Sequence, residues 1–305
     1  MQVDYVLILA AGKGTRMGSI GKILPKVIWP VFNKSLLELQ VRYANKFNPS
    51  KIFINLFNNK DQILDHIEKS DVFNSIEVLI EDKKMDIGGA IHNLAKTVEY
   101  KGRLLVINAD QFLMFNEETK ENIFLDDDFD VKLLTYKVKK SQGYNQVLSN
   151  KGDFIEVKPN SGVNEEEFET YCGVSLIKLE SLDKIEGESR FFESVVNTEK
   201  QKVKTVSIGN SLYWDFGTVS RYYDSMFKIC NDIYKNNIDL FLNFLLKEKA
   251  LEKEKISESS YNSDMENVID LANNVHAENS IYLSQVDTKS NTQKSVHYKN
   301  AVNFV

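Results

Sequence analysis

Residues 6–26 read VLILAAGKGTRMGSIGKILPK, and this stretch decides the fold. Its first six residues, 6–11, are all apolar, which is typical of a central strand buried on both faces of a sheet. The turn that follows contains two glycines, and glycine lets backbone N–H groups approach a ligand closely. Such groups bind anions, and cationic side chains around them strengthen the binding. The cations are Lys13, Arg16 and Lys26. We therefore expect a strand that leads into a phosphate-binding loop.

Two common glycine motifs do not match this loop. A P-loop, G-x-x-x-x-G-K-[ST], fails because Ile23 stands where Ser or Thr is needed. A dinucleotide fingerprint, G-x-G-x-x-G, would need glycine at position 17, which is Met17. The stretch resembles instead the signature of the sugar-1-phosphate nucleotidylyltransferases, L-A-A-G-x-G-T-R-M followed by P-K, which stands here as residues 9–17 and Pro25-Lys26.

Length and composition indicate a large catalytic domain with an appendage. The chain has 305 residues, a hydrophobic fraction of 42% and a net charge of -6, which argues against a nucleic-acid surface. Its two cysteines, Cys172 and Cys230, lack metal-ligand spacing and fit a reducing compartment. No apolar run approaches the length of a membrane span, so we expect a cytoplasmic protein without a membrane partner.

Strand and helix patterns alternate along the first part of the chain. Residues 51–56 and 76–80 have the pattern of strands, and residues 35–47 and 61–69 have helical spacing. This order predicts an α/β fold with a Rossmann-like, mostly parallel sheet covered by helices on both faces. Ligands of such sheets lie beyond the carboxyl ends of the strands.

Two aspartates follow apolar stretches and predict a magnesium site. Asp110 ends the run LLVINAD, and a carboxylate beside a triphosphate is repulsive unless a divalent cation lies between them. Asp215, in YWDFGT, resembles the second metal ligand of the family. The resemblance implies that both hold Mg²⁺. Asp215 is also a candidate N-cap for a helix beginning near Val219, as is Thr218.

The resemblance further implies roles for residues throughout the site. The catalytic residues would be Arg16, Lys26, Asp110 and Asp215. The nucleotide-binding residues would be Leu9, Ala11, Gly12, Lys13, Gly14, Thr15, Glu81 and Gly88. The acceptor-binding residues would be Asn145, Glu156, Lys158 and Gly173. The chain departs from the family pattern at Asp86, Ile87, Asn145 and Tyr171. The glycine pair that begins at Gly88 has an alternative interpretation, in which it forms the turn at the start of a helix and does not contact the nucleotide.

The expected reaction condenses a nucleoside triphosphate, UTP or GTP, with a sugar 1-phosphate to give a nucleotide sugar and pyrophosphate. The acceptor is already an anion, so no general base is needed, and the protein must neutralise and align two anions. Within the family, the chain is most similar to N-acetylmuramate-1-phosphate uridylyltransferases or mannose/heptose-1-phosphate guanylyltransferases, which implies nucleotide-sugar synthesis for cell-envelope polysaccharide. Two alternatives stay open: a cytidylyltransferase for an acceptor such as phosphocholine, and a non-catalytic regulatory subunit that binds nucleotide sugars.

The expected organisation has three parts: a catalytic domain over residues 1–228, a helical segment over 229–256 and an extension over 257–305. In the extension, apolar residues recur at positions 275, 281, 286, 296 and 302, which are Val275, Ile281, Val286, Val296 and Val302. The gaps from 275 to 281 and from 296 to 302 are six residues, as in a hexapeptide β-helix. The polar composition around them is also that of a disordered tail, and both readings stay open. The oligomeric state is open too.

Overall fold

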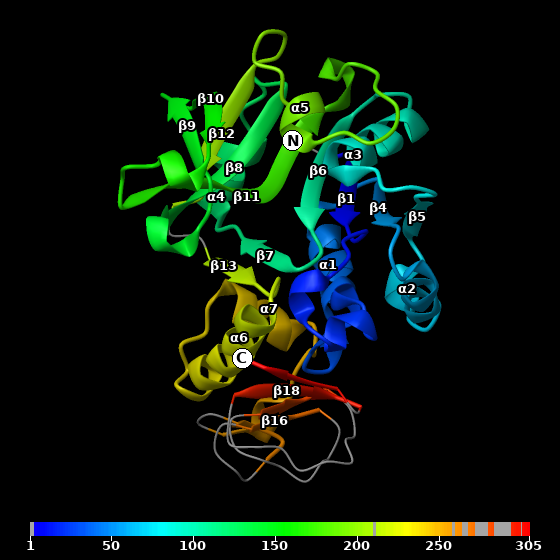
Figure 1. Cartoon of the computed structure of the whole chain (residues 1–305), viewed down its shortest axis with the longest axis vertical. Helices are drawn as coiled ribbons and strands as arrows, with labels where there is room; N and C mark the ends of the chain where they lie inside the picture. The colour runs from blue at the N-terminus through cyan, green and yellow to red at the C-terminus, as the bar shows by residue number, and fades with distance from the viewer. Residues whose placement is uncertain are drawn as a thin grey trace.

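A nine-stranded mixed sheet forms the centre of the chain (Figure 1). The computed structural model describes residues 3–209, 212–257, 260–263, 268–271, 280–283, 294–299 and 301–305. In spatial order the strands are β5 (Ile76–Ile80), β4 (Lys51–Leu56), β1 (Tyr5–Leu9), β6 (Arg103–Asn108), β11 (Glu167–Lys178), β8 (Val131–Lys139), β12 (Val203–Ser207), β10 (Asp153–Lys158) and β9 (Gln146–Asn150). The signature strand β1 lies between β4 and β6 and is parallel to both.

The sheet confirms the predicted fold class and adds an antiparallel part. Strands β5, β4, β1 and β6 are parallel, as expected. Strand β11 runs antiparallel to β6 and β8, and β10 runs antiparallel to β12 and β9. The parallel strands place their carboxyl ends on one edge, where the signature loop begins.

Helices cover both faces of the parallel strands. Val6 and Ile8 of β1 pack in one core with α1, whereas Leu7 packs in another core with α3. Side chains of a strand point alternately to its two faces, so an all-apolar strand is required here. The helices are α1 (Leu36–Ala44), α2 (Lys60–Ile67), α3 (Asp86–Thr97), α4 (Glu117–Phe124), α5 (Phe191–Ser194), α6 (Val219–Tyr234) and α7 (Leu240–Lys247).

Short elements connect this framework. The 3₁₀ turns are η1 (Thr15–Met17), η2 (Ile20–Lys22), η3 (Lys26–Ile28), η4 (Asn45–Phe47), η5 (Asp71–Phe73), η6 (Lys140–Gln142), η7 (Asn160–Gly162), η8 (Leu179–Ser181) and η9 (Lys253–Lys255). Two small sheets pair β2 (Pro30–Val31) with β3 (Lys34–Ser35), and β7 (Gln111–Met114) with β13 (Leu212–Asp215). The second of these small sheets builds the candidate site.

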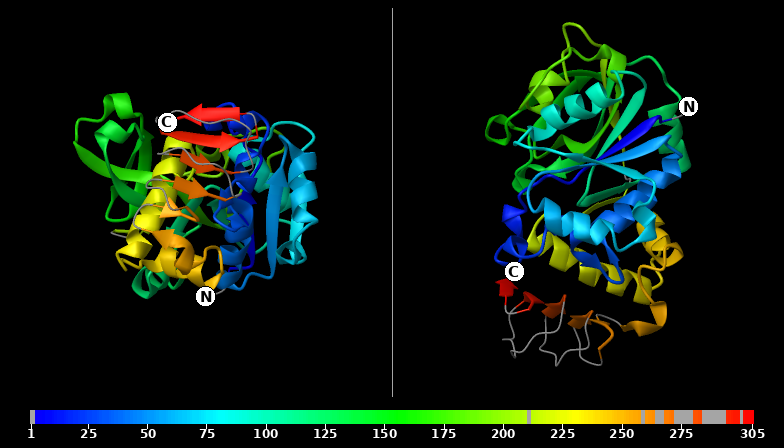
Figure 2. Two further views of the ribbon diagram at one scale, coloured as in Figure 1. Left: turned by 90° about the horizontal axis from the view of Figure 1, so that it is seen from below. Right: turned by 90° about the vertical axis from the view of Figure 1, so that its right-hand side faces the viewer.

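Short strands stack at the C-terminal end of the chain (Figure 2). They are β14 (Ile256–Ser257), β15 (Ser260–Tyr261), β16 (Val268–Asp270), β17 (Ser280–Tyr282), β18 (Ser295–Tyr298) and β19 (Ala301–Phe304). Strands β15 to β18 are parallel, with Tyr261, Ile269, Ile281 and Val296 in register. The spacing between these positions is unequal, unlike the expected repeat of six. Val275 and Val286 lie outside the described residues.

The C-terminal part shares a core with the signature region. Met17, Trp29, Phe241, Ile281 and Val296 belong to one hydrophobic cluster. Helix α6 crosses the boundary expected at residue 228, and α7 ends at Lys247, before the end of the helical segment expected at residue 256. Among the helices that the structure describes, none is long and apolar enough to cross a membrane.

Candidate active site

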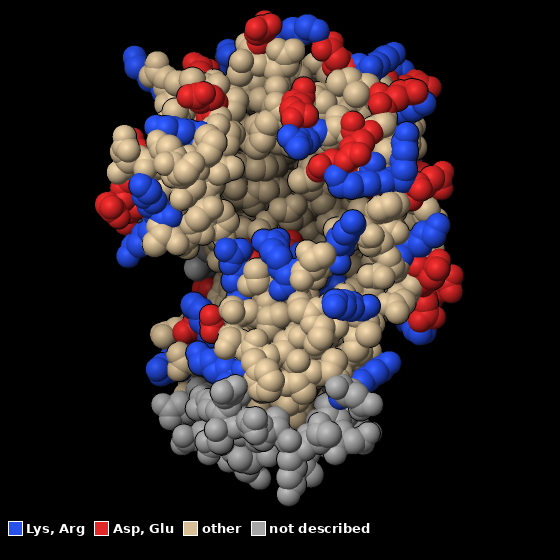
Figure 3. All heavy atoms as spheres, in the orientation of Figure 1, with Lys and Arg blue, Asp and Glu red and all other residues tan. Residues whose placement is uncertain are grey.

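A pocket of about 410 Å³ lies at the carboxyl ends of β1, β4 and β6. Figure 3 shows a hollow on the face seen in Figure 1, with Lys and Arg side chains gathered along its lower edge. The cations that line the pocket are Lys13, Arg16, Lys26 and Lys84. Of these four, Lys84 was not predicted. The predicted site residues that also line the pocket are Leu9, Ala11, Gly12, Glu81 and Asp110. The pocket therefore gathers distant parts of the sequence into a site suited to an anion.

Asp110 lies in the turn between β6 and β7 and pairs with Lys26. The Lys26 ammonium donates a hydrogen bond to Asp110 Oδ2, and both side chains are partly buried. Lys26 begins η3, and its Cβ would lie 3.6 Å from a Cβ added at Gly14. The carboxylate and the ammonium thus lie directly beside the signature turn, as the motif predicts.

Asp215 reaches the same place through the pairing of β13 with β7. Asp215 stands opposite Gln111, and the next residue, Phe216, donates its backbone N–H to Asp110 O at 2.9 Å. A Cβ added at Gly217 would lie 2.8 Å from Asp215 Oδ1 and 2.9 Å from Asp110 Oδ2. The two carboxylates therefore border the same small space, and only glycine at position 217 leaves it open.

Thr218, not Asp215, is the N-cap of α6. The Thr218 side chain accepts a hydrogen bond from Arg221 N, whereas Asp215 Oδ1 accepts one from Gly217 N at 2.7 Å. The capping interpretation of Asp215 is wrong, because Thr218 occupies the N-cap position and Asp215 lies three residues earlier, at the end of β13. Its other oxygen, Oδ2, pairs with Arg221 at 2.6 Å.

Arg16 lies on η1, in the loop that follows Gly14. Its Nη2 would be 3.7 Å from the Cβ added at Gly217, so it reaches toward both carboxylates. No acidic partner within ion-pair distance of Arg16 occurs in the described part of the chain, and its side chain is exposed. An exposed guanidinium without an acidic partner, in a concave site, is suited to bind a phosphate.

Glu81 is held to the signature strand by Asn55. Asn55 Nδ2 donates to Glu81 Oε1 at 2.7 Å, and Asn55 Oδ1 accepts from Ala10 N at 2.9 Å. Glu81 is 5% exposed, and burial raises its pKa, while the hydrogen bond from Asn55 acts against this. The pocket therefore also contains a buried carboxyl group at the end of β5, whereas Asp110 follows β6.

Several expected site residues lie elsewhere. A Cβ at Gly88 would lie 2.3 Å from Ser194 Oγ, so this glycine allows α3 to pack against α5, and Gly88 does not line the pocket. Asn145, Glu156 and Lys158 belong to the region of β9 and β10 and do not line it either. Gly14 and Thr15 form the loop without lining the pocket.

Gly173 supports the pocket from behind. Its φ is +82°, and an added Cβ would lie 2.1 Å from Asn108 Nδ2 and 3.0 Å from Gln111 Oε1. Asn108 and Gln111 line the pocket on either side of Asp110 and are joined by a hydrogen bond of 2.6 Å. Any side chain at position 173 must displace them.

We expect Gly173→Ala to lower activity at least about tenfold, because displaced groups beside Asp110 misalign the site. Gly143→Ala is the matched control, since Gly143 has a φ of +76° and no atom within 4 Å of an added Cβ. Both variants carry backbone strain of about 1–3 kcal/mol, visible as lower melting temperatures. The rate of pyrophosphate release distinguishes the two variants, since only Gly173→Ala should lose activity. Equal activity of the two variants would contradict the role of Gly173.

The sequence reasoning missed several residues that build the site. Asn55, Asn58 and Asn108 lie at or just beyond the ends of β4 and β6, where polar residues follow apolar strands. A polar residue at the carboxyl end of a parallel strand is itself a signal for a ligand-binding position. Arg221 has no such signal, because only the fold of α6 brings it to Asp215 and places it 5.3 Å from the Tyr144 ring.

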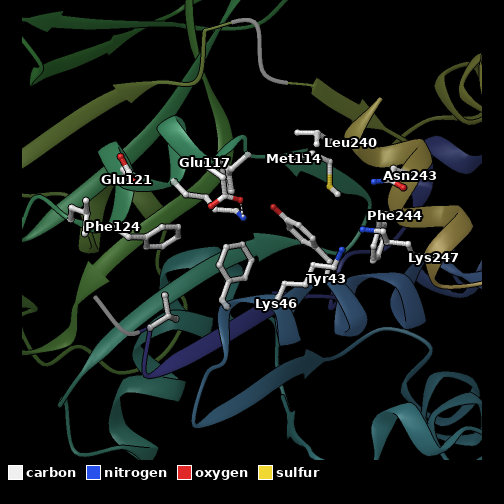
Figure 4. Close-up of a pocket in the computed structure, with 15 residues that line it drawn as sticks. Tyr43, Lys46, Met114, Glu117, Glu121, Phe124, Leu240, Asn243, Phe244 and Lys247 are labelled. Carbon is white, nitrogen blue, oxygen red and sulfur yellow. Dashed lines mark hydrogen bonds and ion pairs between the residues drawn. The ribbon is translucent and has the colours of Figure 1, made fainter. Parts of the chain in front are cut away.

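A second cavity, of about 480 Å³, lies apart from these motifs (Figure 4). Aromatic side chains such as Tyr43 and Phe244 line it, together with Lys46 and Lys247. The Lys46 ammonium lies 4.2 Å from the Phe244 ring centre, and burial lowers the pKa of this lysine. None of the predicted site residues lines this cavity.

Solved structures with the same fold include two nucleotide-related proteins. HddC from Yersinia pseudotuberculosis, complexed with GMP-PN, has a TM-score of 0.61 and 22% identity, over 74% of this chain and 99% of that one. The inositol-1-phosphate CTP transferase from T. maritima has a TM-score of 0.58 and 16% identity, over 74% of this chain and 96% of that one. These likenesses support the α/β fold described above.

Sequence comparison identifies the family. The chain is 28% identical over 219 residues to the bifunctional protein GlmU of Buchnera aphidicola subsp. Schizaphis graminum, covering 67% of this chain and 46% of that relative. The chain thus spans about half the length of the curated relatives that it matches. Residues 5–232 match the family model described as nucleotidyl transferase, which confirms the resemblance seen in the signature. The chain belongs to the nucleotidyl transferase family.

Proposed function

We propose that this protein transfers a nucleotidyl group from a nucleoside triphosphate to a sugar 1-phosphate, releasing pyrophosphate. The observation that carries the proposal is that Arg16, Lys26 and Asp110 line one pocket and that Asp215, which does not itself line it, borders the same space at Gly217 as Asp110. An oxygen of the acceptor phosphate attacks the α-phosphorus of the triphosphate, and the bond from that phosphorus to the β-phosphate oxygen breaks. The acceptor carries its own negative charge, so the protein need only align and neutralise the two reactants.

The residues present fit a magnesium ion. Asp110 and Asp215 border the space at Gly217, and no cluster of three or more His, Cys, Asp or Glu occurs among the described residues. Two carboxylates completed by phosphate oxygens and water form the set that Mg²⁺ prefers. When bound, the ion would neutralise charge on the phosphates. Lys26 and Arg221, which pair with the two carboxylates, would then be available to phosphate groups.

We propose GTP as the preferred triphosphate, on the chemistry of Glu81. An ionised carboxylate only accepts hydrogen bonds, and guanine offers two adjacent donors, its N1–H and its exocyclic amino group. Uracil offers one N–H between two carbonyl oxygens, which a carboxylate repels. The structure of HddC was determined with GMP-PN, a guanine nucleotide analogue, whereas the curated relatives are GlmU proteins.

The acceptor site is proposed on the side of Asn145, Glu156 and Lys158. Tyr144, which precedes Asn145, contacts the guanidinium of Arg221, and Arg221 pairs with Asp215. This chain of contacts links the β9–β10 region to the carboxylates. A non-sugar acceptor is the second candidate, because the T. maritima structure of the same fold is an inositol-1-phosphate CTP transferase.

The test is a matrix of four nucleoside triphosphates against glucose, mannose, heptose, N-acetylglucosamine, N-acetylmuramic acid and inositol phosphates, with phosphocholine added. Pyrophosphate release with one sugar 1-phosphate supports the proposal, and release with inositol phosphate or phosphocholine supports the second candidate. Tight binding of a nucleotide sugar without release from any pair would indicate a regulatory subunit instead.

We expect Glu81→Gln to lower kcat/KM for GTP about tenfold or more relative to UTP, because the amide places a donor against a guanine donor. Since burial raises the pKa of Glu81, protonation also disables it at a pH above the usual glutamate range. The KM for GTP should therefore rise as the pH falls, and this rise should vanish in Glu81→Gln. Glu77→Gln, on strand β5, which Glu81 directly follows, is the control. An unchanged GTP-to-UTP ratio would refute the assignment.

A further inference from the structure

The C-terminal strand β19 contacts the signature loop directly through Asn303, which is 7% exposed. The side-chain amide of Asn303 accepts hydrogen bonds from Ser19 N at 2.9 Å and from Ser19 Oγ at 2.7 Å. It also donates one to Met17 O at 2.8 Å. One side chain therefore holds the loop backbone on both sides of Gly18.

Gly18 and Asn303 fit each other closely. Gly18 has a φ of +61°, and a Cβ added there would lie 2.5 Å from Asn303 Oδ1. No residue other than glycine leaves room for the amide in this position. The amide satisfies one backbone carbonyl and one backbone N–H, as a neighbouring strand would. The contact thus specifies the conformation of the loop after Met17.

The loop held in this way carries Arg16. Met17, whose carbonyl Asn303 binds, is fully buried in the core that also contains residues of β17 and β18. A cavity of about 400 Å³ is bounded by Arg16, Thr218 and residues 302–304. Strand β19 therefore adjoins both loops of the candidate site, the signature loop and the loop after Asp215.

We propose that Asn303 is a positioning residue, and that β19 completes the active site by fixing the loop that orients Arg16. The proposal rests on the proposed function. Arg16 lies on a single 3₁₀ turn between Gly14 and Gly18, both with positive φ, so regular structure alone does not fix its direction. The family match ends at residue 232 and does not include this strand.

Amide hydrogen exchange tests the contact without any substrate. Asn303→Ala removes all three hydrogen bonds of the amide. Ser19→Ala, at an exposed position, removes only the one from Ser19 Oγ to Asn303, together with a longer one of 3.3 Å from Ser19 Oγ to Val302 O. We expect much faster exchange in residues 15–22 of Asn303→Ala and a smaller increase in Ser19→Ala. Asn150→Ala, at an exposed asparagine that ends β9, should leave the exchange unchanged. Unchanged exchange in Asn303→Ala would overturn the proposal.

Turnover in two backgrounds tests whether Asn303 acts through Arg16. With GTP, magnesium and the best sugar 1-phosphate, we expect Asn303→Ala to lower kcat about 10- to 100-fold and to leave the KM for the sugar phosphate unchanged. In an Arg16→Ala background the same substitution should have little further effect, as for coupled residues. A purely structural role would lower kcat by the same factor in both backgrounds and would overturn the positioning role.

Failure of the proposed function is distinguishable from failure of this inference. If the natural protein releases no pyrophosphate from any substrate pair, the proposed function fails. The coupling is then tested by the affinity for magnesium GTP in place of kcat. Calorimetry measures this affinity in the natural protein, Asn303→Ala, Arg16→Ala and the double variant. Independent effects of Asn303→Ala and Arg16→Ala on that affinity would overturn the coupling, and non-additive effects would support it.

Discussion

Asp110→Asn is expected to lower pyrophosphate release about a thousandfold or more while the protein stays folded. The two proposed metal ligands are Asp110 and Asp215, and a bound divalent cation is worth several kcal/mol of charge stabilisation, at about 1.4 kcal/mol for each tenfold in rate. Asparagine keeps the shape and can still accept the hydrogen bond from Lys26, so the melting temperature should fall by only about 2–4 °C. A coupled pyrophosphate assay measures the first effect and circular dichroism the second.

The matched control is Asp224→Asn on α6, because it makes the same change of charge at an exposed carboxylate. This control should keep full activity. Binding of Mn²⁺, followed by electron paramagnetic resonance, should weaken in Asp110→Asn and stay unchanged in the control. Near-normal turnover of Asp110→Asn with any working substrate pair would show that Asp110 is not a metal ligand in the reaction.

The sequence predicted the parallel half of the fold well, because burial leaves a strong pattern there. The ranges expected for two strands, 51–56 and 76–80, are those of β4 and β5. A strand enclosed on both faces must be apolar throughout, and β1 shows this at Leu7 and Ile8. The antiparallel strand β11 was harder to place, because buried and partly exposed residues alternate along its first half and its partners β6 and β8 are distant in sequence.

The candidate site could be predicted where a motif names its residue, and not where the fold alone supplies it. Lys26, Asp110 and Asp215 stand in recognisable motifs, and the structure brings them together. Arg221 and Asn55 stand in no motif, and their places depend on how α6 and β4 pack. Gly88 shows the converse, since its motif suggested a nucleotide contact and the structure uses it for the packing of α3 on α5.

The C-terminal extension shows why spacing alone was misleading. Strand stacking needs one inward apolar residue per layer, and Ile269, Ile281 and Val296 meet this need with unequal connections between them. A fixed period of six therefore included Ile281 and Val296 of the stack but not Tyr261 or Ile269. The hydrogen bonds of Asn303 to residues 17 and 19 span the whole chain, and no local pattern announces such a contact.

Arg16→Ala is expected to lower kcat about 100- to 1,000-fold and to raise the KM for the triphosphate. The guanidinium has no acidic partner in the described residues and lies beside the space that Asp110 and Asp215 border. In the proposed reaction, negative charge grows on the departing pyrophosphate, and removing one donor aimed at such charge typically costs this much. Pyrophosphate release at saturating acceptor measures the loss.

Arg16→Lys separates charge from geometry in this prediction. Lysine keeps the positive charge but lacks the planar pair of donors that binds two phosphate oxygens at once, so only part of the activity should return. Lys22→Ala, at an exposed lysine on η2 that does not line the pocket, controls for the loss of one positive charge near the loop and should keep full turnover. If Arg16→Lys were as active as the natural protein, charge alone would account for Arg16. If Arg16→Ala were no worse than Lys22→Ala, the guanidinium would have no role in the reaction, and the loop held by Asn303 would serve the fold alone.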